Sequence, residues 1–169
     1  LFAPLRRSLV ALLAGVALVV APSTGALLFP TIADAAVING AITNVEIVET
    51  TQAQYQNVRI NLDWRVPDGT QAGDTFTLTL GPPALWDSIV TNTFNLVDPA
   101  TGEVVATATI RGLTVTFTMT AYAENHINVR GTAYLTAKIA RDADLGNNTA
   151  TLTTDVDEVL GVCRHREGD

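Results

Sequence analysis

Few side chains in this 169-residue sequence are of the kinds that enzymes use for catalysis. Between residues 36 and 157 there is one serine, Ser88, and one histidine, His126. A Ser-His-acid site would require these two to meet, and no G-x-S-x-G motif surrounds Ser88. Zinc requires three or four nitrogen or sulfur ligands, and of the two histidines and one cysteine in the sequence, His165 and Cys163 lie in the predicted frayed tail, so a zinc site is not supplied. The sequence therefore predicts neither a hydrolytic triad nor a zinc site.

Carboxylates are more numerous, and a pair of them could act as acid and base on a glycosidic bond. The candidates for such a pair are Asp63, Asp68, Asp74, Asp87, Asp98 and Glu103. Most lie in or beside predicted turns, where Asp commonly bonds the local main chain. Residues 142–148 resemble the opening of a calcium-binding loop but lack its closing Glu. We predict no enzymatic activity and no cofactor, and calcium binding at 142–148 stays open.

Lys138 is the candidate residue for an intramolecular isopeptide crosslink. Some exported β domains carry a Lys-Asn isopeptide crosslink, which requires a buried, deprotonated amine beside a carboxyl group. Lys138 shares its predicted strand face with Tyr134 and Thr136, opposite the apolar Leu135 and Ile139. This phase directs the amine toward water, and we therefore predict no crosslink at Lys138.

The elements that must position these side chains are strands. Val58, Ile60, Leu62, Trp64 and Val66 alternate with polar residues, which is typical of a strand with one buried face. Pro67-Asp68-Gly69 has the composition of a turn, and a second alternating run follows at 74–80. We expect Trp64 to be buried against Phe76 and Phe117.

Further alternating segments and turns follow along the chain. We expect a short helical turn at 83–89 and a loop at 142–148, and no other helix. Strands are predicted at 42–48, 57–66, 74–80, 93–97, 103–110, 113–120, 128–139 and 149–156, with 103–120 forming a hairpin around Arg111-Gly112. Short strands at such spacing indicate an all-β sandwich or barrel. The long polar faces favour an immunoglobulin-like β-sandwich.

The two ends of the chain differ in composition from the rest. Arg6 and Arg7 precede the apolar run 9–20, and Ala33-Asp34-Ala35 forms a small-x-small cleavage signature, which predicts a signal peptide at 1–35. The apolar run is shorter than the roughly 20 residues of a membrane span, so we expect no membrane association after cleavage. We expect the sandwich to occupy 36–157 and a disordered or truncated tail to occupy 158–169, including Cys163.

The net charge of −7 argues against some classes of binding partner. A nucleic-acid partner would require a basic stripe on a basic domain, and we predict no such partner. One cysteine excludes an internal disulfide, so a secreted domain of this kind would depend on its core alone.

Three stretches resemble a known family: "VRINLDWRVPDGTQAGDTFTLTL", "FNLVDPATGEVVATATI" and "TVTFTMTAYAENHINVRGTAYLTAKI". Together they resemble the SDR-like immunoglobulin domain of Gram-positive cell-wall-anchored adhesins of the fibrinogen- and collagen-binding type, over residues 42–153. The W-x-x-P-x-G turn leading into "AGDTFTLTL" is the most specific part. The resemblance implies a variant immunoglobulin sandwich, attachment to host or matrix proteins, and no enzymatic activity.

The resemblance also implies a mode of binding. In the family, a peptide docks between this domain and a following immunoglobulin-like domain, whose latch strand pairs with a T-Y-T-F-T-D-Y-V segment. The matching residues here are Thr114, Val115, Thr116, Phe117 and Thr118, followed by Tyr122. We predict that the strand 113–120 lies at a sheet edge and accepts another strand. The alternative is a central strand whose threonines form the wet face of a sheet.

The sequence thus predicts a secreted, non-enzymatic adhesin domain, at the cell surface or wall if the whole protein carries a sorting signal. Its expected partners are an extracellular protein or peptide and a downstream immunoglobulin-like domain of the same protein. Two alternatives stay open: a spacer module of a surface protein, and a carbohydrate-binding sandwich. The latter usually needs an exposed aromatic platform, for which Trp86 is the tryptophan left once Trp64 is buried.

Overall fold

Strand β3 (Asn57–Arg65) shows how the sequence pattern becomes structure. Its residues Val58, Ile60, Leu62 and Trp64 are all buried, while the residues between them face outward. The alternation follows from the period of two in an extended chain. The strand ends before the turn that contains Gly69, whose φ of 88° lies in the left-handed region that favours glycine.

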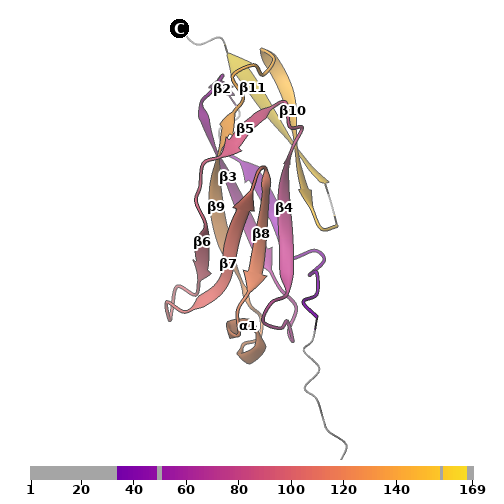
Figure 1. Cartoon of the computed structure of the whole chain (residues 1–169), viewed down its shortest axis with the longest axis vertical. Coiled ribbons are helices and arrows are strands. Elements are labelled where there is room, and N and C mark those ends of the chain that lie inside the picture. The colour runs from indigo at the N-terminus through magenta and orange to yellow at the C-terminus, as the bar shows by residue number, and fades with distance from the viewer. Residues whose placement is uncertain (1–33, 49–50, 157, 167–169) are drawn as a thin grey trace, which may run out of the picture. The chain divides into compact units, whose positions relative to one another are not determined.

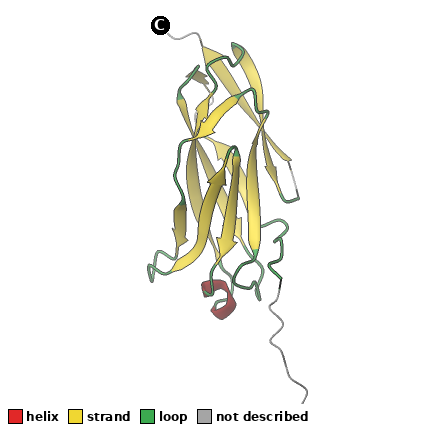
Figure 2. Cartoon of the chain, viewed as in Figure 1, coloured by secondary structure: helices red, strands yellow, loops and turns green. Residues whose placement is uncertain are grey.

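The computed structural model describes residues 34–48, 51–156 and 158–166, which form two β-sheets packed face to face (Figures 1 and 2). One sheet has the strand order β1-β3-β9-β5, and the other has the order β2-β11-β10-β4-β8-β7-β6. The bounds are β1 Ile42–Ile47, β2 Thr51–Ala53, β4 Thr75–Gly81, β5 Trp86–Ile89, β6 Phe94–Val97, β7 Val104–Arg111, β8 Thr114–Met119, α1 Tyr122–Asn125, β9 Arg130–Ile139, β10 Gly146–Thr154 and β11 Glu158–Arg166. The predicted all-β sandwich is confirmed.

The core lies between the two sheets and is centred on aromatic rings. Trp64 on β3 stacks on Phe76 on β4 with ring centroids 6.3 Å apart, and Phe76 stacks on Phe117 on β8 at 4.6 Å. Trp64 is 3% exposed, so its predicted burial is confirmed, and it reaches Phe117 through Phe76. On β9, Gly131 lies opposite Trp64, and a Cβ there would lie 2.9 Å from the indole ring. Glycine is therefore required for this ring to fit.

The segment after residue 157 differs from expectation. Residues 158–166 form β11, which pairs antiparallel with β10 from Gly146 to Thr153 and parallel with β2. The prediction of a disordered tail is therefore wrong for these residues. Tertiary context explains the difference, because the segment completes an edge that β10 would otherwise leave unpaired. The signal-peptide prediction concerns residues 1–35, of which 1–33 lie outside the described residues.

Two local expectations also change. Residues 86–89 form a strand rather than a helical turn, because they pair with the end of β9. A single helical turn, α1, occurs instead at Tyr122–Asn125. The hairpin of β7 and β8 around Gly112 is confirmed, with Arg111 opposite Thr114.

In the described part of the chain no helix has the length and apolar character needed to cross a bilayer.

Candidate functional site

Strand β9 leaves part of one edge without a partner strand. On one side it pairs with β3 over its whole length, from Arg130 opposite Arg65 to Lys138 opposite Asn57. On the other side, β5 pairs only with its end, at 137–139. The last contacts there are at Thr136, whose carbonyl accepts from Val90 N at 2.8 Å and whose N–H donates to Thr91 Oγ1 at 2.7 Å. Among the described residues, no strand pairs with 130–135 on this side.

The direction of the main-chain groups follows from Thr136. Because alternate residues of a strand direct their N–H and C=O groups to the same edge, the groups of Thr132 and Tyr134 face the same way as those of Thr136. The structure thus places main-chain donors and acceptors of β9 along an unpaired edge. Such an edge is a template for pairing with another extended chain.

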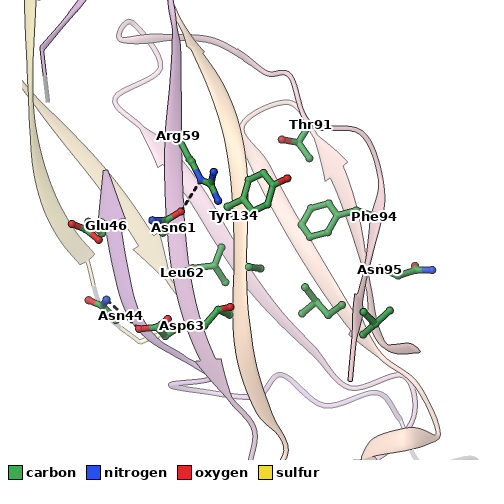
Figure 3. A pocket seen from close by; sticks show the side chains of 14 residues that line it. Asn44, Glu46, Arg59, Asn61, Leu62, Asp63, Thr91, Phe94, Asn95 and Tyr134 are labelled. Carbon is green, nitrogen blue, oxygen red and sulfur yellow. Dashed lines mark hydrogen bonds between the residues drawn. The ribbon is translucent and has the colours of Figure 1, made fainter. Parts of the chain in front are cut away.

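A cleft of about 690 Å³ lies beside this edge (Figure 3). It is lined by β1, β3, β9, β6 and the connection from β5 to β6. The lining residues are Asn44, Glu46, Arg59, Asn61, Leu62, Asp63, Thr91, Phe94, Asn95, Leu96, Val97, Thr132, Ala133 and Tyr134. Strand β6 is the last strand of its sheet, so its outer edge is also without a partner strand among the described residues. The cleft therefore lies beside two free strand edges.

The side chains in the cleft combine apolar and hydrogen-bonding groups. Phe94 packs edge-on against the buried Phe117, with centroids 6.2 Å apart. The guanidinium of Arg59 lies 3.9 Å from the ring centroid of Tyr134, and Figure 3 shows the two side chains facing each other. Arg59 Nε donates to Asn61 Oδ1 at 3.0 Å. A cleft with an apolar wall and a few fixed polar groups is suited to binding a ligand.

The predicted latch-receiving strand lies elsewhere and is not at an edge. Strand β8 pairs with β4 on one side and with β7 on the other. Val115 and Phe117 are fully buried in the core. The predicted edge position is therefore wrong, and the alternative of a central strand is what the structure shows. The side chains of Thr114, Thr116 and Thr118 lie on the outer face, where Thr114 and Thr79 share a hydroxyl hydrogen bond of 3.0 Å.

Tyr122 has a contact of a different kind. Its hydroxyl donates to Asp98 Oδ2 at 2.6 Å, and its ring stacks on His126 with centroids 3.8 Å apart. The hydrogen bond lowers the pKa of Asp98, helped by the Ala100 N–H that donates to the same carboxylate. The same bond, with partial burial, raises the pKa of Tyr122 to about 12. Tyr122 thus fastens α1 to the turn between β6 and β7.

The other residues considered for chemistry are not brought together. Ser88 Oγ donates to Asp87 Oδ2, and His126 Nδ1 lies 2.8 Å from the carbonyl of Tyr122. Asp74 accepts from the main-chain N–H of Gln71 within its own turn and from the N–H of Ala36 in the segment before β1. In the described part of the chain, no three His, Cys, Asp or Glu side chains form a metal-binding group. The side chain of Cys163 lies outside the described set.

The sequence does not identify the residues that line the cleft as a binding site, although Asp63 is among the candidate carboxylates. Trp86 is buried and donates to Gly81 O at 3.1 Å, so it provides no exposed platform. Tyr134 is 54% exposed in the polar phase of β9, and this outward aromatic was a signal available in the sequence. The contribution of Phe94 and Leu96 could not be found, because it depends on how β6 faces β9.

Comparisons with known proteins agree with this fold. A family model described as bacterial Ig domain matches residues 51–149, and the chain belongs to that family. A search of curated proteins finds no match. The described sheets are an immunoglobulin-like sandwich of the kind found in Gram-positive adhesins.

Solved structures of similar fold include three surface proteins. The collagen adhesin CNA of S. aureus superposes with a TM-score of 0.65 at 16% identity, over 81% of this chain and 46% of that one. The serine-rich repeat adhesion glycoprotein Srr1 of Streptococcus agalactiae gives 0.57 at 16% identity, over 77% and 47%. The collagen-binding domain of the Erysipelothrix rhusiopathiae surface protein RspB gives 0.56 at 18% identity, over 78% and 48%. The chain thus spans about half the length of these structures, and likeness at such identity shows the fold.

Proposed function

We propose that this domain is a secreted or surface-attached, non-enzymatic adhesion module that captures an extended segment of an extracellular protein. The observation that carries the proposal is the unpaired edge of β9 at residues 130–135, beside the cleft between β9 and β6. Main-chain groups on such an edge would supply affinity, and the cleft side chains would supply selectivity. The adhesin structures of the same fold and the resemblance in the sequence support the same role.

The proposed binding position moves from β8 to β9. Strand β8 has both edges occupied, so it has no main-chain groups to offer. The segment bound at β9 would run between β9 and β6, with Phe94 and Leu96 on one side and Tyr134 on the other. A strand from a following immunoglobulin-like domain would compete for the same edge. That following domain is an expected partner.

Collagen is the first protein to test, because two of the fold relatives are named for binding it. The probes are immobilised collagen and an array of overlapping peptides from collagen and fibrinogen. Thr132→Pro removes one main-chain donor from the free edge, whereas Thr132→Ala removes the same side chain and keeps the donor. We expect binding to fall about tenfold with Pro and to stay unchanged with Ala, since a lost hydrogen bond contributes about 0.5–1.5 kcal/mol and the ring also obstructs pairing.

Two outcomes would count against the proposal. Equal binding by Thr132→Pro and Thr132→Ala would place the ligand away from the β9 edge. A stably folded protein that binds none of the matrix probes would favour the spacer alternative. Hydrogen exchange separates the readings further, since the amides of Thr132 and Tyr134 should exchange quickly when free and slowly when a segment is bound.

A further inference from the structure

Cationic side chains in this acidic protein are collected on one face. Of the side chains that the structure describes, six are Lys or Arg and twelve are Asp or Glu. Five of the six cations belong to β3, β9 or the turn after β9, on the outer side of the four-stranded sheet: Arg59, Arg65, Arg130, Lys138 and Arg141. We call this group the cationic face. The sixth cation, Arg111, is at the end of β7 in the other sheet.

The cationic face holds its charge in three positions along β9. Arg65 and Arg130 are at one end, Arg59 lies over Tyr134 in the middle, and Lys138 and Arg141 are at the other end. Eight residues separate Arg130 from Lys138, which corresponds to about 27 Å of extended chain. The arrangement is thus a stripe long enough for several units of a linear polymer.

The pair Arg65 and Arg130 is unfavourable without an anion. The two residues lie directly opposite each other in the register of β3 and β9, and both side chains are exposed. The adjacent hydrogen bond from Val66 N to Val129 O shows that the arginines form a non-hydrogen-bonded pair, in which side chains are closer together. Like charges in this position destabilise a sheet. A hollow of about 470 Å³ beside them is also lined by Thr43 and Thr132, which can donate hydrogen bonds to an anion, and by Asp63, whose carboxylate offsets part of the arginine charge.

Aromatic rings accompany the cations at the other two positions. Tyr134, which is 54% exposed, lies under Arg59, and Tyr55, which is 44% exposed, lies under both Lys138 and Arg141 at 4.3 and 4.7 Å. Tyr55 has a φ of 60°, in the left-handed region that a bulky residue rarely adopts. The fold accommodates this strained conformation and places the ring beside two cations. The cationic face therefore offers flat aromatic surfaces next to its positive charges.

We propose that the cationic face binds a linear anionic glycan. The cations would pair with its sulfate or carboxylate groups, and Tyr134 and Tyr55 would pack against the faces of its sugar rings. The face also carries Glu46, Asp63 and Asp87, and the turn that holds Arg141 carries Asp142 and Asp144, so face and turn hold five cations and five anions, while the other described side chains hold one cation and seven anions. Screening over about 8 Å at physiological ionic strength limits the effect of the more distant carboxylates on an anion bound at this face, despite the net charge of −7. A polyanion without sugar rings would gain the charge contacts alone.

The experiment measures binding of heparin, hyaluronan and poly-L-glutamate to the purified protein at several NaCl concentrations. Heparin carries sulfates, hyaluronan carries carboxylates alone, and poly-L-glutamate carries carboxylates without sugar rings. We expect a glycan to bind more tightly than poly-L-glutamate, and binding to weaken as NaCl rises, because neutralised polymer releases counterions. Preference for heparin over hyaluronan would identify sulfate as the anionic group, and equal binding would identify the carboxylate.

The variants are Arg65→Ala with Arg130→Ala, Lys138→Ala with Arg141→Ala, and Arg111→Ala as the matched control. We expect each double variant to lose at least about tenfold in glycan affinity, because it removes two charge-assisted contacts, and Arg111→Ala to bind like the parent. The first double variant should fold at least as stably as the parent, because it relieves a like-charge pair. Tyr55→Ala should weaken glycan binding and leave poly-L-glutamate binding unchanged.

Three results would overturn the proposal: no glycan binding at physiological salt, an equal loss in Arg111→Ala, or poly-L-glutamate binding as tightly as either glycan. The two proposed sites share Arg59, Tyr134 and Thr132, and the variants distinguish the sites by the groups that they change. Arg65, Arg130, Lys138 and Arg141 contribute charge to the stripe, whereas Thr132→Pro acts on the main chain of the β9 edge. Loss of glycan binding with intact collagen or peptide binding, or the reverse, shows which of the two proposals fails.

Discussion

Strands β8 and β9 have similar patterns in the sequence and different positions in the fold. Each alternates inward-facing residues with polar ones, and the polar face carries three threonines in β8 and two in β9. Strand β8 has partners on both sides, whereas β9 has a free edge at 130–135 among the described residues (Figure 1). The comparison shows that a period of two determines which side chains are buried and says nothing about which main-chain groups are paired.

The physical reason is geometric. Side chains of a strand stand perpendicular to the sheet, while its hydrogen bonds lie in the sheet. The hydrophobic pattern constrains the first direction, and the order of strands decides the second. A threonine-rich segment is therefore no guide to an edge, and the resemblance of "TVTFT" to a latch-receiving segment did not reveal that β4 and β7 flank it.

The largest expected effect comes from the core that the two sheets share. Trp64→Ala should destabilise the fold by about 3–5 kcal/mol, because it leaves a cavity against Phe76. Tyr134→Ala is the matched control, since it removes an exposed aromatic ring from the neighbouring strand and should cost about 1 kcal/mol or less. Urea unfolding of both variants gives the free energies. A Trp64→Ala protein that melts within about a degree or two of the parent would contradict the packing described for β3.

A smaller loss is expected where β9 meets the same ring. Gly131→Ala should cost about 1–3 kcal/mol, because the new Cβ would lie 2.9 Å from the Trp64 indole. Thr132→Ala, one residue further along β9, should leave the unfolding free energy nearly unchanged. Combining Gly131→Ala with Trp64→Phe should cost less than the sum of the two single changes. Strict additivity would show that the glycine is not required by the tryptophan.

A proline in each strand tests the comparison of edges directly. In Thr116→Pro, β8 loses a main-chain donor that faces β7 and leaves a carbonyl unsatisfied. In Thr132→Pro, β9 loses a donor that faces the free edge. We expect Thr116→Pro to be the less stable by about 1–2 kcal/mol, which is the usual penalty for one unsatisfied buried group. Thermal unfolding of the pair measures the difference. A Thr132→Pro protein that is equally damaged would mean that the β9 edge is occupied.

The smallest effect concerns Tyr122, which lies outside both strands. The hydroxyl of Tyr122 lowers the pKa of Asp98, so Tyr122→Phe should raise that pKa toward the ordinary Asp range, as an NMR titration of the carboxyl would show. The lowered pKa means that the bond stabilises the fold at neutral pH and that this contribution is lost as the pH falls through the lowered value. On the alkaline side the contribution is complete below about pH 10 and is lost as the pH rises to about 12, the pKa of Tyr122.

A titration of the parent protein is the control for the Tyr122→Phe variant. Tyr122 should ionise late, near pH 12, in an absorbance titration. That late step should be missing in Tyr122→Phe. An unchanged Asp98 titration in the variant would show that the hydrogen bond between the two side chains does not form in solution.

Part of the fold could be predicted because local signals agreed with the tertiary structure. The alternation at 57–66, the turn at 67–69 and the hairpin around Gly112 all depend on neighbours in the sequence, and all are present. Strand β11 and the strand at 86–89 could not be predicted in the same way. The strand at 86–89 is fixed by pairing with β9, far along the chain, which carries no local signal. Strand β11 pairs with the preceding strand β10, but its second partner, β2, lies far earlier in the sequence.

The candidate site likewise has features that the sequence predicts and features that only the fold decides. The sequence by itself determined the alternation of side-chain faces, the burial of Trp64 and the outward phase of Tyr134, because each follows from the two-residue period of an extended chain. The tertiary structure alone decided that β8 is central, that β9 has a free edge, and that Phe94 on β6 lies across a cleft from it. It also decided that five cations from distant positions share one face of an acidic protein. The reason is that strand order is set by long-range pairing, which is a property of the whole sheet and not of any one strand.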